Sequence, residues 1–349
     1  MCNGFPLHAM IRFAFALLAP VLTVSAQPPP GYYDTAQGLT GEALRAALNQ
    51  IISPHSVLAY SQLWSAFART DRRPDGSVWD MYSDVPSGTL PYSFQFVSDQ
   101  CGTYNGEGDC FNREHSFPVS WFNDVLPMNT DLNHIFPTDA WVNQQRGNLP
   151  YGTVASASWT SQNGGKRGPC SWPDCSGTVF EPIDLYKGDL ARGHLYMLTR
   201  YMNESASWPA PILSTGEFLP WAESVLLAWH AQDPVSDKER ARNDSVHVIQ
   251  GNRNPYIDHP EWVTFIWGPE AGVGEMARLQ VQVQVIGDEL VITSTDQLAP
   301  ITGSIIDATG REIIPVRMVP GRVIIPFPFP SGVYLLRPQS GPGAARFVR

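Results

Sequence analysis

Prolines and glycines are spread along the whole chain, and their number limits the folds that it can adopt. The 349 residues include 31 prolines and 29 glycines, so loops and short strands are expected in place of a helical bundle. Hydrophobic residues make up 43% of the chain, with 16 Phe, 12 Tyr and 11 Trp side chains. This apolar surface excludes disorder over the whole chain. The length indicates two or three domains.

The chain is acidic. It has 33 Asp and Glu residues against 23 Lys and Arg residues, which gives a formal net charge of −10 at pH 7. Binding of nucleic acid by bulk electrostatic attraction is therefore excluded, whereas a locally basic cleft is not. A polyanionic partner would have to be held by local cationic side chains or by a bound metal.

Residues 1–26 have the pattern of a secretory signal peptide. An apolar run at residues 13–24 follows Arg12, and the small residues that end at Ala26 resemble a cleavage site before Gln27. The run is too short for a transmembrane helix. We therefore expect a secreted protein without stable membrane insertion.

Four cysteines remain after this segment, and an even number in an oxidising compartment favours two disulfides. They are Cys101, Cys110, Cys170 and Cys175. Three pairings are possible, and we favour the local pairs Cys101–Cys110 and Cys170–Cys175, each of which closes a glycine-rich loop. The alternative is a metal site made from Cys101, Cys110 and nearby histidines, and the lack of a CxxC spacing argues against it.

Residues 27–270 carry the mixed signals of an α+β domain. Thr40 is placed to cap a helix whose apolar residues recur at helical spacing through Ile51. Further helices are expected at about residues 185–202 and 221–231.

A linker at residues 271–279 leads to a tail of different character at residues 280–349. Residues 279–285 alternate strictly between apolar and polar side chains, as a half-buried strand does. Further short strands are expected at residues 289–294, 303–307, 322–326 and 332–337. About seven strands in this length predict a small all-β sandwich. The tail contains no His or Cys, and no catalytic group is expected in it.

A dense cluster of polar residues at 112–148 carries the strongest functional signal. Asp139 is placed to begin a short helix that Gly147 ends. Asn143 and Arg146 follow Asp139 by four and seven residues, so the three side chains share one face of this helix.

Two extended segments are expected before this helix, one around Glu114 and His115 and the other at residues 131–135. The order of strand, loop, strand and helix can bring Glu114, His115 and Asn143 around one small site. Successive residues of a regular strand point to opposite faces, so both strand residues reach one site only at a bulge or at a strand end.

These residue types have a chemistry in common. Glu114 and Asn143 offer two hard oxygen ligands, which suit Mg²⁺ when water and phosphate complete its coordination. His115 is a base that is neutral near pH 7. A histidine base beside such a metal can cleave a phosphodiester bond. The sequence lacks the HExxH and HxxEH motifs of zinc proteases, a G-x-S-x-G elbow and a P-loop.

Four short motifs occur in order within the cluster. They are Asn112-Arg113-Glu114-His115, Asp131-Leu132-Asn133-His134, Trp141-Val142-Asn143 and Arg146-Gly147-Asn148. In this order they resemble the motifs of the secreted bacterial endonuclease I family, whose members are ββα-metal, or His-Me finger, nucleases. The resemblance extends from about residue 31 to residue 268.

The resemblance implies a role for each central residue. His115 would be the general base, and Glu114 and Asn143 would hold one Mg²⁺ ion, for which Mn²⁺ or Ca²⁺ could substitute. The substrate would be DNA, and often RNA too, cut with little sequence preference to leave 5′-phosphate ends.

The second motif departs from the family pattern. Members often carry Asp-Leu-His-His or Asp-Leu-His-Asn, where this chain has Asn133 and His134. Because both positions stay polar, we expect these residues to support the site through altered hydrogen bonds without loss of activity.

The loop before the second strand is the other departure. Some members hold the cleaved phosphate with an arginine there, and residues 122–130 of this chain contain no basic residue. Arg113, Arg146 or Arg192 would take this role for the substrate phosphate. The alternative for Arg192 is an ion pair with Asp189, one helical turn away.

The tail resembles a type IX secretion sorting domain through residues 331–337 and the basic, apolar end at 345–349. This resemblance implies export across the outer membrane with the type IX secretion machinery as partner. The sequence as a whole thus predicts a secreted, Mg²⁺-dependent endonuclease. Two other hypotheses remain: a non-catalytic secreted protein that binds nucleic acid or a surface, and a phosphodiesterase for small or cyclic substrates.

Overall fold

The computed structural model describes the chain in six stretches. These are residues 27–268, 281–294, 301–307, 311–318, 321–338 and 345–349. The expected signal peptide and linker lie outside them. In these stretches, no helix has both the length and the apolar character needed to cross a membrane.

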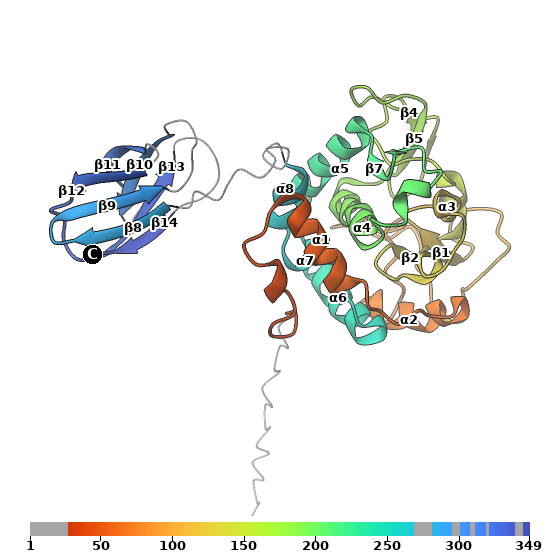
Figure 1. Cartoon of the computed structure of the whole chain (residues 1–349). Helices are drawn as coiled ribbons and strands as arrows, with labels where there is room; N and C mark the ends of the chain where they lie inside the picture. The colour runs from red at the N-terminus through yellow and green to blue at the C-terminus, as the bar shows by residue number, and fades with distance from the viewer. Residues whose placement is uncertain (1–26, 269–280, 295–300, 308–310, 319–320, 339–344) are drawn as a thin grey trace, which may run out of the picture.

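Eight α-helices are found in residues 27–268 (Figure 1). They are α1 (Gly41–Ile52), α2 (Leu63–Thr70), α3 (Ala140–Arg146), α4 (Lys187–Arg200), α5 (Pro220–Gln232), α6 (Asp237–Gln250), α7 (Pro255–Asp258) and α8 (Glu261–Trp267). The three predicted helices are present as α1, α4 and α5. Thr40 occupies the N-cap position of α1, but its side chain makes no capping hydrogen bond.

Helix α4 lies at the centre of this region. All of its residues are buried, and it packs against α1, α5 and α7. Its apolar side chains join one large core with residues from α1, α5 and α8. A helix that is buried all round needs partners for its polar side chains as well, and several of these partners shape the site described below.

The strands of the same region form three small antiparallel sheets. They are β1 (Phe111–His115) with β2 (Ile135–Asp139), β3 (Trp159–Thr160) with β4 (Lys166–Pro169) and β5 (Thr178–Glu181), and β6 (Leu213–Ser214) with β7 (Glu217–Phe218). Mixed helices and sheets of this kind make an α+β fold. The prediction of a strand at residues 131–135 was wrong in its bounds, because residues 131–134 form a turn and β2 starts at Ile135.

Seven strands follow in the described parts of residues 281–348. They are β8 (Val281–Ile286), β9 (Glu289–Ser294), β10 (Ile301–Asp307), β11 (Glu312–Met318), β12 (Gly321–Pro326), β13 (Val333–Pro338) and β14 (Ala345–Val348). One sheet has the order β11-β10-β13-β14 and the other β12-β9-β8. Apolar side chains from both sheets, including Leu290, Ile305 and Leu336, form one buried cluster.

Both predicted disulfides are present. Cys101 is bonded to Cys110, and Cys170 to Cys175, with Cα atoms 5.6 Å and 6.0 Å apart. The alternative metal site at Cys101 and Cys110 is therefore wrong, because the two sulfur atoms are bonded to each other.

A buried carboxylate joins the turn before β2 to the helices behind it. Asp131 is fully buried; its Oδ2 accepts hydrogen bonds from the hydroxyls of Tyr196 and Tyr201 at 2.7 and 2.8 Å, and its Oδ1 accepts one from Gln250 Nε2 at 2.8 Å. Burial by itself would raise the pKa of Asp131, but His55, His134 and hydrogen bonds from Gln250 and the Asn133 amide hold the pKa below its ordinary value. The carboxylate is therefore ionised, and it ties the turn to α4 and α6.

We predict that Asp131→Asn lowers the free energy of unfolding on the order of 3 kcal/mol at pH 7, because it leaves buried donors without an anionic acceptor. Since the folded-state pKa lies below the ordinary 3.8, the carboxylate's contribution to stability is present above pH 3.8 and is lost as pH falls below it. Urea unfolding of both proteins at several pH values measures this. Asp174→Asn, at an exposed position, is the control; equal stability losses in the two variants would contradict the prediction.

Candidate active site

Glu114 and His115 are the last two residues of β1. The strand stops at His115, and both Glu114 and His115 are buried, with 1% and 6% of their surface exposed. Successive residues of a strand point to opposite faces, and here both faces are covered. Glu114 contacts Arg146 on α3, whereas the His115 ring lies parallel to that of Tyr60. The strand ends at His115, and the convergence of both side chains on one site stays a prediction.

Helix α3 is set against this strand end by its caps. The Asp139 carboxylate accepts a hydrogen bond from the Val142 amide at 2.8 Å, which begins the helix. Gly147, with a φ of +54°, ends it. The predicted helix, from its N-cap at Asp139 to Gly147, is confirmed.

The face of α3 that was predicted to be functional does contact β1. Asn143 Nδ2 donates to Asn112 Oδ1 at 2.7 Å and to the Arg113 carbonyl at 3.4 Å. One turn later, Arg146 Nη1 donates to Glu114 Oε1 at 2.8 Å and to the His115 carbonyl at 2.7 Å. Helix α3 therefore contacts the side chain of Glu114 and the main chain of His115, and Asn143 lies on the same helix.

Glu114 is held through only one of its two oxygens. Oε1 accepts from Arg146 and from the hydroxyls of Tyr82 and Tyr151, at 2.9 and 3.4 Å. Burial raises the pKa of this carboxyl group, and Arg146 and the two tyrosines oppose the shift without cancelling it. A nearby cation that favours the charged form would bring the pKa down again.

Two oxygens at this place have no hydrogen-bond partner among the residues that the structure describes. One is Glu114 Oε2, because the bonds to this carboxylate all end on Oε1. The other is Asn143 Oδ1, because the bonds of this amide all start from Nδ2. A carboxylate and an amide oxygen fit the ligand preference of Mg²⁺, which keeps several waters and needs few protein ligands.

A metal site with more protein ligands is not found. Within the described stretches, no group of three or more His, Cys, Asp or Glu side chains could hold a metal ion. The residues therefore fit an ion that binds two protein oxygens, with water and substrate as its other ligands.

The orientation of His115 is fixed by a main-chain atom. Its Nε2 lies 3.1 Å from the Asn129 carbonyl oxygen; because a carbonyl can only accept, Nε2 carries the proton and Nδ1 the lone pair. Burial lowers the pKa of His115 to about 3, and the neighbouring His134 adds to this shift. The imidazole is therefore neutral and able to accept a proton at Nδ1.

Asn133 and His134 lie behind the site. Asn133 donates through its main-chain and side-chain nitrogens to Asp131 Oδ1, at 3.0 and 3.2 Å. His134 is fully buried and bonds the Met128 carbonyl at 2.8 Å, and its ring centroid lies 5.6 Å from that of His115. Both residues thus hold the turn on which β2 and the site depend.

The three candidate arginines differ in their access to a substrate. Arg113 is half-buried and lies on the outer side of β1, with its guanidinium 3.9 Å from the ring centre of Tyr60. Arg146 has only 1% of its surface exposed and is occupied with Glu114 and main-chain carbonyls. Of the three, Arg113 is the only one whose side chain is not fully buried.

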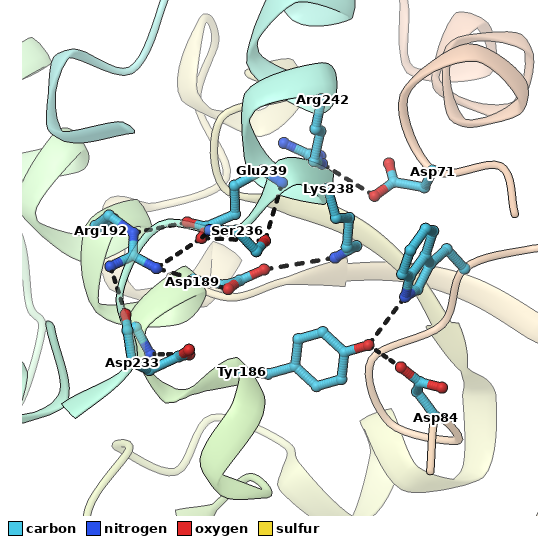
Figure 2. Close-up of polar contacts among 12 residues, drawn as sticks. Asp71, Asp84, Tyr186, Asp189, Arg192, Asp233, Ser236, Lys238, Glu239 and Arg242 are labelled. Atoms are coloured by element: carbon cyan, nitrogen blue, oxygen red, sulfur yellow. Dashed lines mark hydrogen bonds and ion pairs between the residues drawn. The ribbon is translucent and has the colours of Figure 1, made fainter. Parts of the chain in front are cut away.

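Arg192 is enclosed in a network of charged residues (Figure 2). It donates to both carboxylate oxygens of Glu239, at 2.6 and 2.7 Å, and to the Asp233 carbonyl at 2.8 Å. Its surface is fully buried. The expectation that Arg192 contacts a substrate phosphate is therefore wrong, and the alternative ion pair with Asp189 is present at 3.7 Å.

Sequence reasoning missed three residues that hold the central pair. Tyr82 and Tyr151 bind Glu114, and the Asn129 carbonyl binds His115. The tyrosines lie more than 30 residues from Glu114 in the sequence. A contact made by a main-chain carbonyl cannot be predicted from residue type, because every residue has this group. The one available signal was the position of Asn129 just before the second motif.

Comparison with known proteins shows the family of this chain. Residues 40–261 match the profile of the family described as Endonuclease I. The chain belongs to the Endonuclease I family. It is therefore a nuclease, an enzyme that hydrolyses phosphodiester bonds, and the hypothesis of a non-catalytic protein is not supported.

Several relatives of this Endonuclease I family chain are named as extracellular nucleases. It is 38% identical to an extracellular ribonuclease of Bacillus subtilis, over 68% of this chain and 78% of the relative. It is 35% identical to an extracellular ribonuclease of Bacillus amyloliquefaciens, over 71% and 81%. It is 24% identical to an extracellular deoxyribonuclease of Aeromonas hydrophila, over 69% and 95%.

We predict that Arg146→Ala lowers the free energy of unfolding of this Endonuclease I protein by about 3–5 kcal/mol, because Glu114 would remain buried without its counter-charge. Arg167→Ala is the matched control. Arg167 also contacts α3, through Gln145 Oε1 at 2.9 Å, but it is only half-buried, so a loss within about 1 kcal/mol is expected. Urea unfolding decides between them, and similar small losses in both variants would refute the prediction.

Proposed function

We propose that the protein is a secreted, Mg²⁺-dependent endonuclease of the ββα-metal, or His-Me finger, type that cuts DNA and RNA with little sequence preference. The contacts at the end of β1 support this proposal. There, His115 has its Nδ1 lone pair fixed by the Asn129 carbonyl, and Asn143 comes close through its bonds to the preceding strand residues.

In the proposed reaction, His115 Nδ1 takes a proton from a water molecule. The water oxygen forms a bond to phosphorus while the bond from phosphorus to the 3′ oxygen breaks. The products are a 5′-phosphate and a 3′-hydroxyl, which takes its proton from solvent. Because His115 is neutral at pH 7, it can act as the base without first losing a proton.

Glu114 and Asn143 would hold the ion through Oε2 and Oδ1. When bound, Mg²⁺ supplies positive charge that stabilises the phosphorane and the leaving oxygen. Arg146 keeps Glu114 in place from behind, and Arg113 is the residue that would contact the substrate phosphate.

The proposal covers both nucleic acids. The relatives named ribonuclease are more similar to this chain, at 35–38% identity, than the relative named deoxyribonuclease, at 24%. We therefore propose RNA as a substrate as well as DNA. Export by the signal peptide, and a type IX sorting role for the tail with the secretion machinery as its partner, belong to the same proposal.

We expect His115→Ala to lower the rate of cleavage by roughly 10²–10⁴-fold, the usual contribution of a positioned acid–base group. The nicking of supercoiled plasmid and the cutting of RNA measure the rate, and circular dichroism checks that the fold is intact. His259→Ala is the control, since His259 is partly exposed beside Glu261 on α8 and should leave activity unchanged. A His115→Ala protein that nicks plasmid at the parental rate would disprove the assignment of the base.

Removal of the metal should abolish cleavage. In excess EDTA no nicked or linear plasmid should form, and added Mg²⁺ should restore both products, because Glu114 and Asn143 alone provide no positive charge for the transition state. Full activity in the chelator would exclude these two residues as metal ligands.

A further inference from the structure

An exposed aromatic ring lies directly beside the proposed base. Tyr60 is the first residue of the short 3-10 helix η2 (Tyr60–Gln62), just before α2, and 43% of its surface is exposed. Its ring is nearly parallel to that of His115, with centroids 6.3 Å apart and an interplanar angle of 11°. An isolated exposed tyrosine is ordinary, but one aligned with a proposed catalytic ring is in the path of the substrate.

The ring of Tyr60 is also held in a fixed position. The guanidinium of Arg113 lies 3.9 Å from the Tyr60 ring centre and 4.3 Å from that of Trp64. Arg113 Nη1 in addition donates to the Tyr60 carbonyl at 3.1 Å. Cation–π contacts of this kind fix a ring while leaving part of it in water, so Tyr60 is preorganised and still accessible.

A second segment beside His115 also presents apolar side chains to solvent. Leu126 and Val125 are 60% and 46% exposed. They belong to the loop whose Asn129 carbonyl holds His115, and the Asn129 amide donates to the Val125 carbonyl at 3.1 Å. Exposed apolar groups near a catalytic group favour flat, apolar parts of a substrate over phosphate alone.

We infer that Tyr60 and Arg113 form a subsite for one unpaired nucleobase next to the scissile phosphate, which makes single-stranded nucleic acid the preferred substrate. This inference rests on the proposed function. The base stacks on the exposed part of the Tyr60 ring, and the guanidinium of Arg113 faces the neighbouring phosphate. In a duplex the bases are already stacked on one another, so only an unpaired base has a free face for the tyrosine.

The charge of the chain supports the same inference. A net charge of −10 repels a polyanion, and two of the three arginines considered for the phosphate are buried. Stacking of a base on an aromatic ring is independent of this repulsion and contributes strongly to binding of single strands. Base stacking therefore strengthens the binding of an acidic nuclease most when the bases of the substrate are unpaired.

The test compares kcat/KM for a single-stranded oligonucleotide and its duplex in Mg²⁺. Tyr60→Ala should lower kcat/KM on the single-stranded oligonucleotide by about 5- to 100-fold, the usual effect of losing one stacked base. The kcat/KM of this variant on the duplex should stay within about twofold of the parental value. Tyr60→Phe keeps the ring and should retain parental values. Phe265→Ala is the matched control, since Phe265 on α8 is also aromatic and 43% exposed. This variant should keep the parental kcat/KM on both the single strand and the duplex.

A spectroscopic measurement separates stacking from a merely structural role of Tyr60. The His115→Ala variant should bind the oligonucleotide without cutting it. In this variant, 2-aminopurine in a single-stranded oligonucleotide should lose fluorescence on binding. Adding Tyr60→Ala to His115→Ala should abolish this quenching. Equal losses of kcat/KM on both substrates, or quenching that persists in Tyr60→Ala, would overturn the subsite. These outcomes leave the proposed function intact, whereas parental cleavage by His115→Ala alone would refute the proposed function.

Discussion

The ion pair between Glu114 and Arg146 is the interaction on which the site depends. Both side chains are buried, with 1% of each residue exposed, and a buried pair is stable only when hydrogen bonds compensate for the lost water. Here the guanidinium also donates to the carbonyls of His115 and Ser116, and it lies over the ring of Tyr151 at 4.5 Å. Arg146 thereby fastens α3 to the end of β1 at the residues that carry the proposed chemistry.

A second buried anion supports this arrangement from behind. Asp131 binds two tyrosines of the α4 region and Gln250 of α6, and Asn133 binds Asp131 in turn. The turn that carries Asn133 and His134 leads into β2, which pairs with β1. The front of the site is therefore built from α3 and β1, and its back from the central helix of the fold.

Features that arise from local patterns could be predicted from the sequence. Apolar spacing predicted α1 and α4, a proline beyond its end helped to predict α5, and capping residues predicted α3. The glycine-rich loops between the cysteines predicted both disulfides. The start of β2 was placed four residues too early, because the polar residues from Asp131 to His134 make side-chain bonds in a turn and pair with no strand.

The contact of α3 with the end of β1 followed from the expected order of elements, whereas the burial of two arginines did not. Arg192 was a plausible phosphate ligand by residue type. Its partner Glu239 lies 47 residues further along the chain, and such a distant pairing leaves no periodic signal. The contacts of Tyr82 and Tyr151 with Glu114 were not predicted for the same reason. Long-range polar partners decide whether a charged side chain faces solvent or the interior, and residue type cannot distinguish these outcomes.

The bond between His115 and the Asn129 carbonyl has an evolutionary consequence. Every amino acid supplies the same main-chain oxygen, so the identity of residue 129 can drift while the imidazole keeps its tautomer. What selection must conserve is the path of the backbone from Phe122 to Thr130. Insertions and deletions in this loop should therefore be rarer among descendants of this gene than substitutions within it.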